Sequence, residues 1–283
     1  MNQKAFAIFV GAIMIFSAFA GMVMLGGDQS QRPTTVVGSD SLDTFGVQGR
    51  MVEWNFDGLG DTLEMAPETT VMAYWVNMSA PKNLTDAARA SLPQSLGLSY
   101  GSNIYPNKIE RLAVAYFNDT WAEFHWVRPF RVAYDGLVIP YEGFMMIPSS
   151  SDYSAVMGKP ALFGPQEGLE DVLDVISGGL PTDKFTLPQG ETADLQFVVL
   201  GKDAAGADLP GGYQEFYLGI SSAGDEYSVT AKYLQPDAST KEKAKEIADQ
   251  NGLAVSSQGS ITEVSGTVAA DKLSTVLTAF LQP

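Results

Sequence analysis

Carboxylate pairs that flank glycine-containing turns are the first groups in this sequence with types and spacing suited to chemistry. Asp57 and Asp61 flank Gly-Leu-Gly, and Asp203 and Asp208 flank Ala-Ala-Gly-Ala. Oxygen-rich turns of this kind can coordinate calcium, because hard cations prefer carboxylate and carbonyl oxygens. Neither pair has the EF-hand spacing, and aspartate with glycine also forms ordinary solvated turns. We therefore expect solvated loops and no cofactor, with calcium binding as the alternative.

The single histidine is a second candidate for chemistry. His125 stands between Phe124 and Trp126 in a run of strand-forming residues. Alternation along a strand places it on the face opposite these aromatic neighbours. A catalytic triad would need His125 beside a serine and a carboxylate. We therefore expect a structural role for His125, and we expect no catalytic residue.

Aromatic residues form a third group, concentrated in one part of the chain. The four tryptophans all lie between residues 54 and 126. An exposed subset would form a surface that binds protein or glycan, whereas the alternative is a hydrophobic core. The candidate partner-binding residues are Trp54, Trp75, Trp121 and Trp126.

Composition excludes several other classes of site. The chain has no cysteine, so it forms no disulfide, thiolate metal site or thiol nucleophile. No phosphate-binding Gly-x-x-x-x-Gly-Lys and no Gly-x-Gly-x-x-Gly fingerprint occurs. The net charge of −16 opposes contact with phosphate backbones. We expect neither nucleotide nor nucleic acid as a partner.

The elements that must position these residues begin near residue 51. Residues 70–78 favour a strand, and residues 109–117 and 121–127, separated by Asn118, Asp119 and Thr120, favour a hairpin. Further strands are expected at 137–147 and 153–163. A helix should follow, because its apolar residues recur at i, i+3, i+4 and i+7. These helical residues are Leu169, Val172, Leu173 and Ile176.

The C-terminal part alternates in the same way between strands and helices. Strands are expected at 193–200, 213–220, 227–234, 253–257 and 260–269. Ser239 and Glu242 form a capping box and Asn251-Gly252 a stop signal, which predict a helix over 240–250. A last helix should place Leu273, Val276, Leu277, Phe280 and Leu281 on one face.

These patterns predict an α+β fold in which two antiparallel-sheet-plus-helix modules follow one another, over residues 51–186 and 187–283. Both modules end with a strand and a helix of the same apolar spacing. We interpret this as a diverged duplication. The alternative is that two unrelated amphipathic helices look alike.

An apolar run precedes both modules. Residues 5–25 are 21 uninterrupted residues without a charge, which as a helix reach roughly 31 Å, close to the thickness of a bilayer core. We expect residues 1–27 to be a transmembrane signal anchor and residues 28–50 to be a flexible linker. One alternative is a signal peptide cleaved after Ala18-Phe19-Ala20. Another is a pilin-type leader cleaved before Phe6.

Charge at the ends of this run predicts its orientation. Lys4 precedes the run, and Asp28 follows it before the first basic residue, Arg32. By the positive-inside rule the C-terminal domain lies outside the cytoplasmic membrane. We expect a single-pass protein.

One stretch of the sequence resembles a known group of proteins. Residues 141–178 (YEGFMMIPSSSDYSAVMGKPALFGPQEGLEDVLDVISG), with Ala66-Pro67-Glu68-Thr69-Thr70 ahead of an apolar strand, are similar to exported, membrane-anchored archaeal proteins of uncharacterised function. The resemblance covers about a third of the chain. It implies an α+β ectodomain and transfers no catalytic residue.

An anchored fold without catalytic motifs points to a function in binding. Our first hypothesis is a non-enzymatic accessory or scaffolding subunit that contacts another envelope protein. The second is a pilin-like or surface-layer component. The third is a carboxylate-dependent hydrolase of envelope glycans, which would need two acids facing one cleft.

Overall fold

The computed structural model describes residues 34–35, 42–44, 47–105, 107–128, 132–133, 138–149, 152–201 and 212–281. The expected anchor at 1–27 and most of the expected linker at 28–50 lie outside these ranges. Within the described ranges, no helix combines the length and the apolar character needed to cross a bilayer. Nearly all described residues belong to one compact unit, Thr35–Val132 with Gly136–Pro283.

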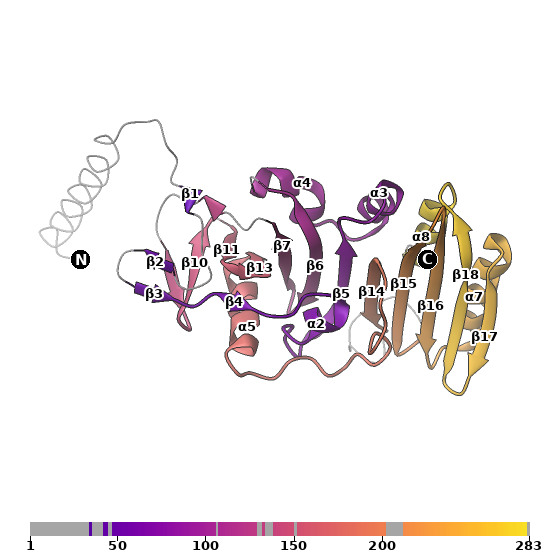
Figure 1. The fold of residues 1–283 in the computed structure, drawn as a ribbon. Coiled ribbons are helices and arrows are strands. Elements are labelled where there is room, and N and C mark those ends of the chain that lie inside the picture. Colours follow the sequence, from indigo (N-terminus) through magenta and orange to yellow (C-terminus); the bar gives the residue numbers. More distant parts are fainter. Residues whose placement is uncertain are drawn as a thin grey trace, which may run out of the picture. The chain divides into compact units, whose positions relative to one another are not determined.

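A large antiparallel sheet dominates this unit (Figure 1). Twelve strands form it, and every neighbouring pair is antiparallel. From one edge to the other the strands are β17 (Ala254–Gln258), β18 (Ile261–Ala269), β16 (Glu226–Leu234), β15 (Glu215–Ala223), β14 (Leu195–Leu200), β5 (Thr70–Asn77), β6 (Ile109–Phe117), β7 (Thr120–Val127), β13 (Ala161–Gly164), β11 (Ser154–Val156), β10 (Phe144–Pro148) and β9 (Ile139–Tyr141). The predicted α+β class with an antiparallel sheet is confirmed.

Helices and short strands complete the described part of the chain. The helices are α2 (Leu59–Leu63), α3 (Lys82–Ser91), α4 (Leu96–Ile104), α5 (Gln166–Ile176), α7 (Ala238–Asn251) and α8 (Leu273–Leu281). The remaining strands are β1 (Thr34–Thr35), β2 (Leu42–Thr44), β3 (Val47–Gly49), β4 (Val52–Glu53), β8 (Val132–Ala133) and β12 (Gly158–Lys159).

The predicted hairpin of β6 and β7 is present. Ile109 pairs with Val127 and Phe117 with Thr120, so two residues form the turn. Both turn residues have positive φ, 47° for Asn118 and 60° for Asp119. Asparagine and aspartate tolerate this region better than other residues with a side chain, which explains why they mark the turn.

The expected strand at 137–147 is instead a second hairpin. β9 and β10 pair with each other, with Phe144 opposite Tyr141. The turn between them is Glu142-Gly143, with φ of 47° and 81°. The prediction of one continuous strand was wrong because the chain turns at Glu142-Gly143, where glycine adopts positive φ without strain.

The cap of α7 also differs from the predicted capping box. Asp237 is the N-cap residue, and its carboxylate accepts the N–H of Thr240 at 2.7 Å. The helix therefore begins at Ala238, ahead of the expected start. Its end is confirmed, since Gly252 follows in the left-handed conformation with φ of 70°.

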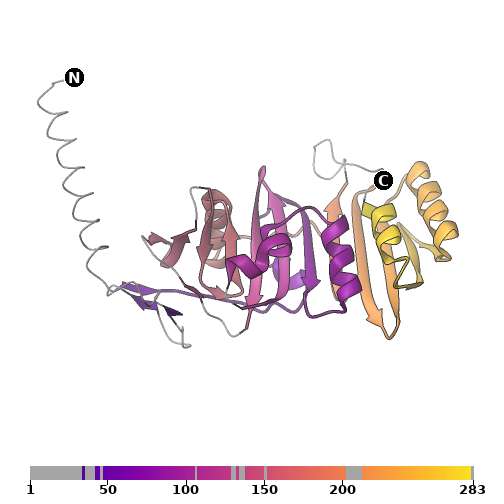
Figure 2. The same cartoon turned by 90° about the horizontal axis from the view of Figure 1, so that it is seen from above.

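Two hydrophobic cores cover the two faces of the sheet. One core packs α3, α4, α7 and α8 against one face, and these helices are seen from above in Figure 2. The other core packs α2, α5 and the segment after β4 against the opposite face. Because side chains alternate between the two faces of each strand, the sheet packs against helices on both faces.

The sheet continues across the expected module boundary at 186/187. β14, from the expected second module, pairs with β5 from the first over Leu195↔Val76 to Val199↔Met72. The division into two modules and the duplication stay predictions.

Candidate functional site

The short parallel pair of β4 and β12 builds one wall of the candidate site. Gly158 lies opposite Val52, and Lys159 lies opposite Glu53. The N–H of Trp54 continues the pairing by donating to the carbonyl of Lys159 at 3.0 Å. A Cβ on residue 158 would lie 2.5 Å from the Val52 carbonyl oxygen. Only glycine therefore lets these two backbones approach each other.

Phe56 and Arg111 hold the chain after β4 in place. The Phe56 ring is buried between Trp75 and Phe124, with ring centroids 6.5 Å and 6.4 Å away. Arg111 on β6 donates to the Phe56 carbonyl at 3.0 Å and pairs with the Asp57 carboxylate. A buried ring and a guanidinium group thus fix residues 53–57 against the sheet.

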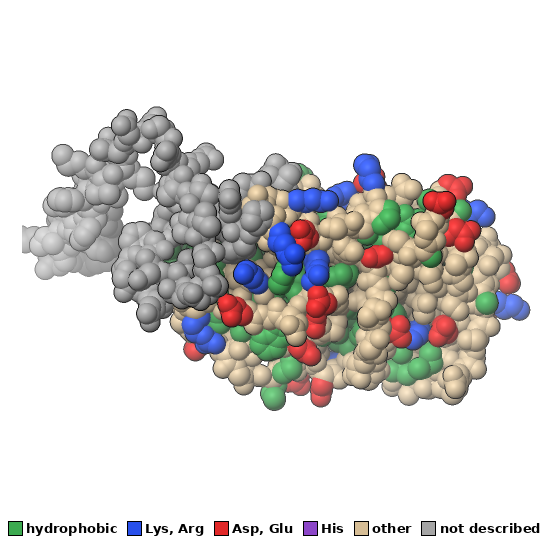
Figure 3. All heavy atoms as spheres, viewed as in Figure 1, with side chains coloured by type: hydrophobic (Ala, Val, Ile, Leu, Met, Phe, Trp, Pro, Cys, Tyr) green, Lys and Arg blue, Asp and Glu red, His purple; other side chains and the backbone are tan. Residues whose placement is uncertain are grey.

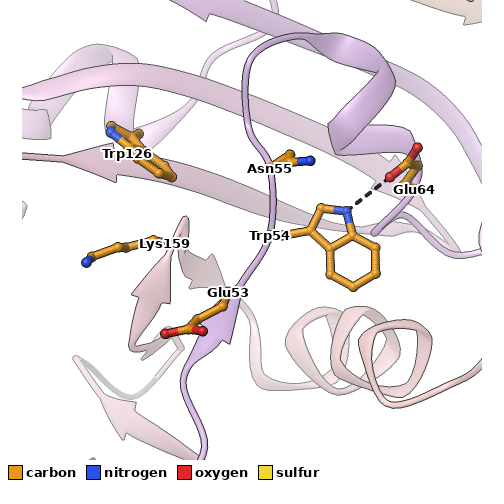
Figure 4. A pocket seen from close by; sticks show the side chains of 6 residues that line it. All are labelled: Glu53, Trp54, Asn55, Glu64, Trp126 and Lys159. Carbon is orange, nitrogen blue, oxygen red and sulfur yellow. Dashed lines mark hydrogen bonds between the residues drawn. The ribbon is translucent and has the colours of Figure 1, made fainter. Parts of the chain in front are cut away.

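An open pocket of about 540 Å³ lies beside this segment (Figure 4). In the view of Figure 4, the Trp54 ring and Glu64 lie on one side of the backbone segment, and Trp126 and Lys159 lie on the other. The Trp54 ring is held by its indole N–H, which donates to Glu64 at 3.2 Å. We call this site the Trp126 pocket, and it is lined by Glu53, Trp54, Asn55, Glu64, Trp126 and Lys159.

Two guanidinium groups face the Trp126 ring. Arg111 lies 5.5 Å and Arg128 5.8 Å from the ring centroid, within the range of cation–π attraction. Arg111 lies across the β6–β7 pair from Trp126, and Arg128 follows two residues later in the chain, so the three side chains share one face. Figure 3 shows Lys and Arg side chains gathered near the middle of the face that Figure 1 presents.

The indole nitrogen of Trp126 has no hydrogen-bond partner in the described structure. This nitrogen is shielded from solvent, as is the unpaired indole nitrogen of the core residue Trp75, so a ligand in the pocket would contact the exposed part of the Trp126 ring and not its N–H. With Lys159, two arginines and two glutamates nearby, the pocket offers aromatic faces and both signs of charge. Such a surface suits a peptide segment or a glycan.

Of the four tryptophans expected at a partner site, the structure brings Trp54 and Trp126 together in the pocket. Trp75 is only 4% exposed and belongs to the core beneath Phe56, so its ring presents no surface. Trp121 is half-buried on β7, where its ring packs against Tyr153 with centroids 5.7 Å apart. It does not line the Trp126 pocket.

Of the two pairs of calcium candidates, the structure describes Asp57 and Asp61. Asp61 accepts the backbone N–H of Asp57, and the Asp57 carboxylate pairs with Arg111. Both carboxylates therefore have protein partners, and no group of three or more potential metal ligands is found among the described residues. Asp203 and Asp208 lie outside the described residues. Calcium binding stays a prediction at both loops.

A buried polar cluster lies on the other face of β7, beneath α4. His125 and Glu123 are fully buried, with Nε2 of the histidine 2.8 Å from the carboxylate. Nδ1 of His125 lies 2.9 Å from the Tyr105 hydroxyl. Burial raises the pKa of Tyr105 above its usual range, and the nearby Glu123 raises it further. The hydroxyl therefore stays protonated, able to donate to His125.

The helix above this cluster contains a sequence pattern that is also found in serine hydrolases. Residues 97–101 read Gly-Leu-Ser-Tyr-Gly, which matches Gly-x-Ser-x-Gly. Here Ser99 lies within α4 and is exposed, whereas a nucleophile elbow places serine at a sharp strand-to-helix turn. Both ring nitrogens of His125 are engaged by Tyr105 and Glu123. The geometry therefore gives Ser99 no histidine base.

Sequence analysis named Trp54 and Trp126 but missed the other pocket residues and the neighbouring Arg111. Arg111 lies opposite Trp126 because the turn of the hairpin has two residues, one fewer than expected. Lys159 and Glu64 had no local signal, since they reach the pocket through the β4–β12 pair and through α2. Such contacts depend on folding distant segments together.

Comparisons with known proteins give no family. No protein-family model and no curated protein matches the chain. Crystal form III of TP0453 is a similar solved structure, 12% identical with a TM-score of 0.48, covering 77% of this chain and 97% of that chain. Form I is 11% identical with a TM-score of 0.47, covering 77% and 96%. Form IV is 12% identical with a TM-score of 0.48, covering 76% and 96%.

Proposed function

We propose that this chain is a membrane-anchored, extracytoplasmic accessory subunit that binds another envelope protein through the Trp126 pocket and performs no catalysis itself. The apolar run at 5–25 and the charges around it support the anchor and the outward orientation. The pocket supports the binding role.

The observation that carries the proposal is the environment of Trp126. Its ring is half-buried and faces two guanidinium groups. Tryptophan and arginine dominate the binding energy of protein interfaces, because they bury large areas and pair specifically. A partner would cover the exposed part of the ring. A carboxylate on the partner would also pair with Arg111 or Arg128.

The test is purification of the full-length chain from its native membrane in mild detergent, followed by mass spectrometry. Trp126→Ala is compared with Trp121→Ala, a half-buried tryptophan of the same strand outside the pocket. We expect a stoichiometric membrane partner with wild type and Trp121→Ala. Its affinity should fall by roughly 30-fold or more with Trp126→Ala, as for an interface hot spot. Equal retention by both variants would exclude the pocket as the partner site.

The same spectra test the anchor. An intact N-terminal segment supports a transmembrane anchor. A chain beginning at Phe6 would favour the pilin-like alternative, and a chain beginning at Gly21 would indicate a cleaved signal peptide.

A second candidate function is hydrolysis of an envelope glycan. Two carboxylates, Glu53 and Glu64, line the same pocket as two indole rings, and aromatic rings stack on sugars. The purified chain would be incubated with isolated envelope glycans, and new reducing ends would be measured. Activity lost in Glu53→Gln and in Glu64→Gln would replace the non-catalytic proposal. Wild-type protein that releases no reducing ends would remove this candidate.

A further inference from the structure

Strand β17 is an edge of the large sheet without the usual protection (Figure 1). It pairs with β18 on one side, and all five of its residues are exposed. Its sequence, Ala-Val-Ser-Ser-Gln, contains no charge and no proline. Its pairing with β18 runs without a bulge from Ala254↔Ser265 to Gln258↔Ile261. Charges, prolines and bulges are the devices by which proteins prevent edge strands from pairing further.

The opposite edge has such devices. β9 is only three residues long, and its central residue is Pro140. Short length and proline both prevent another strand from adding there. The two edges of one sheet therefore differ in their readiness to pair.

The absence of charge around β17 favours a second copy of this chain as the partner that pairs with this strand. The chain carries a net charge of −16, yet residues 250–262 contain no charged side chain. Elsewhere the acidic surface would repel a copy of itself. At β17 a copy can approach without this repulsion. Val255, 39% exposed on this edge, would also be covered.

Helix α7 is self-complementary in charge. It packs over β17 and β18, so it lies beside this edge. Its first seven residues carry Lys241, Glu242 and Lys243, and its last seven carry Lys245, Glu246 and Asp249, so the first half has one excess positive charge and the second half one excess negative charge. Across a two-fold axis perpendicular to the sheet, two α7 helices would run antiparallel, roughly 10 Å apart. The basic half of each would then face the acidic half of the other.

We infer that β17 pairs antiparallel with β17 of a second copy, joining two sheets into one across a two-fold axis near Ser256. Such an interface is isologous, as in most homodimers, and extends the backbone hydrogen bonding of the sheet. It goes beyond the proposed accessory role, because it uses an edge that shares no residue with the Trp126 pocket.

Cysteine cross-linking of the full-length protein in detergent tests the pairing, since the natural chain has no cysteine. Ser256→Cys should oxidise to a covalent dimer, because strands in an antiparallel pair lie about 5 Å apart. Ser228→Cys, on the exposed surface of β16, is the matched control and should stay monomeric. Equal cross-linking at both positions would overturn the inference, as would none at Ser256.

A charge placed on the edge provides the second variant. Val255 is exposed, so Val255→Lys should fold normally, as circular dichroism would check. In the Ser256→Cys background it should slow cross-linking by roughly tenfold, because an edge lysine opposes strand addition. Analytical ultracentrifugation of the wild-type chain should show a dimer. A monomer, or a dimer that Val255→Lys leaves unchanged, would contradict the pairing.

Discussion

The carboxylate of Glu123 accepts the backbone N–H of Gly97 at 2.7 Å and fills the space that a side chain on residue 97 would need. The same carboxylate accepts the N–H of Leu96 at 2.6 Å. These N–H groups belong to the first turn of α4, where no carbonyl of the helix is available to them. A buried carboxyl group on the sheet thus accepts the free N–H groups at the start of a helix packed above it.

Replacing Gly97 with alanine should therefore destabilise the fold. The new Cβ would lie 2.5 Å from Leu112, 2.6 Å from His125 and 2.8 Å from Glu123. We expect the free energy of unfolding to fall by about 1–3 kcal/mol, as for other overpacked cores. Urea unfolding measures this loss.

Gly60→Ala is the matched control for that variant. Gly60 lies in α2, and a methyl group added there would meet nothing within 4 Å. Alanine should therefore preserve stability or raise it by up to about 1 kcal/mol. Equal stability of the Gly97→Ala protein and wild type would show that α4 can shift away from the sheet.

Arg111→Ala should loosen the segment that forms the Trp126 pocket. The variant loses the bond to the Phe56 carbonyl and the ion pair with Asp57. We expect the amides of Val52 and Trp54, which bond to the β12 region, to exchange roughly tenfold faster with deuterium. Arg128→Ala, which removes the other guanidinium facing Trp126, serves as the control. Equal acceleration in both variants would mean that Arg111 does not fix the segment.

Asp194 should make stability sensitive to acid. Partial burial raises its pKa, but bonds from the Ser222 N–H, the Asn77 amide and the Ser222 hydroxyl outweigh burial and hold the pKa below its ordinary value. The unfolded chain therefore binds this proton more tightly. The ionised carboxylate contributes fully to the free energy of unfolding above the ordinary pKa of aspartate. This contribution is lost as the pH falls through the lower pKa of the folded state.

Unfolding free energies measured from about pH 2 to pH 7 test this contribution. Asp194→Asn should be less stable than wild type near neutral pH by about 1–3 kcal/mol, and the difference should narrow in acid. Asp225→Asn, in the exposed turn between β15 and β16, should follow the wild-type curve. A constant gap across the pH range would show that the Asp194 charge plays no part.

Asp119→Gly should stabilise the β6–β7 hairpin. Residue 119 has φ of 60°, which glycine adopts without strain, and Asn-Gly is the favoured pair for a two-residue turn. Because glycine relieves strain at residue 119 but raises the entropy of the unfolded chain, we expect a net gain of a few tenths of a kcal/mol in unfolding free energy, on the order of half a kcal/mol at most. Asp119→Val should be destabilising, because a β-branched residue is strained at positive φ. Thermal unfolding of both variants decides the sign.

The sequence predicted elements whose signals are local. The β6–β7 hairpin follows from alternation and from two turn residues that accept positive φ, and α5 follows from four apolar residues at helical spacing. The start of α7 was misplaced because Asp237, Ser239 and Thr240 all resemble cap residues. In the structure Asp237 alone reaches the first free N–H groups.

Local signals of this kind predict neither the order of the strands in the sheet nor the residues that meet at the site. Nothing in the composition of β14 indicates β5 as its neighbour, because any strand with apolar residues on both faces fits a central place. Trp54 and Trp126 were candidates from their residue type. Their meeting with Lys159 depends on β4 and β12, which are about a hundred residues apart and pair over only two positions.

The pairing of β14 with β5 also makes the two halves of the sequence depend on each other for their backbone partners. If the chain were cut after residue 186, each piece would expose a long central strand, β5 in one and β14 in the other. Neither piece would be expected to remain soluble alone. Mixed together, they should reassemble through these two strands, and intact protein should melt in one cooperative transition.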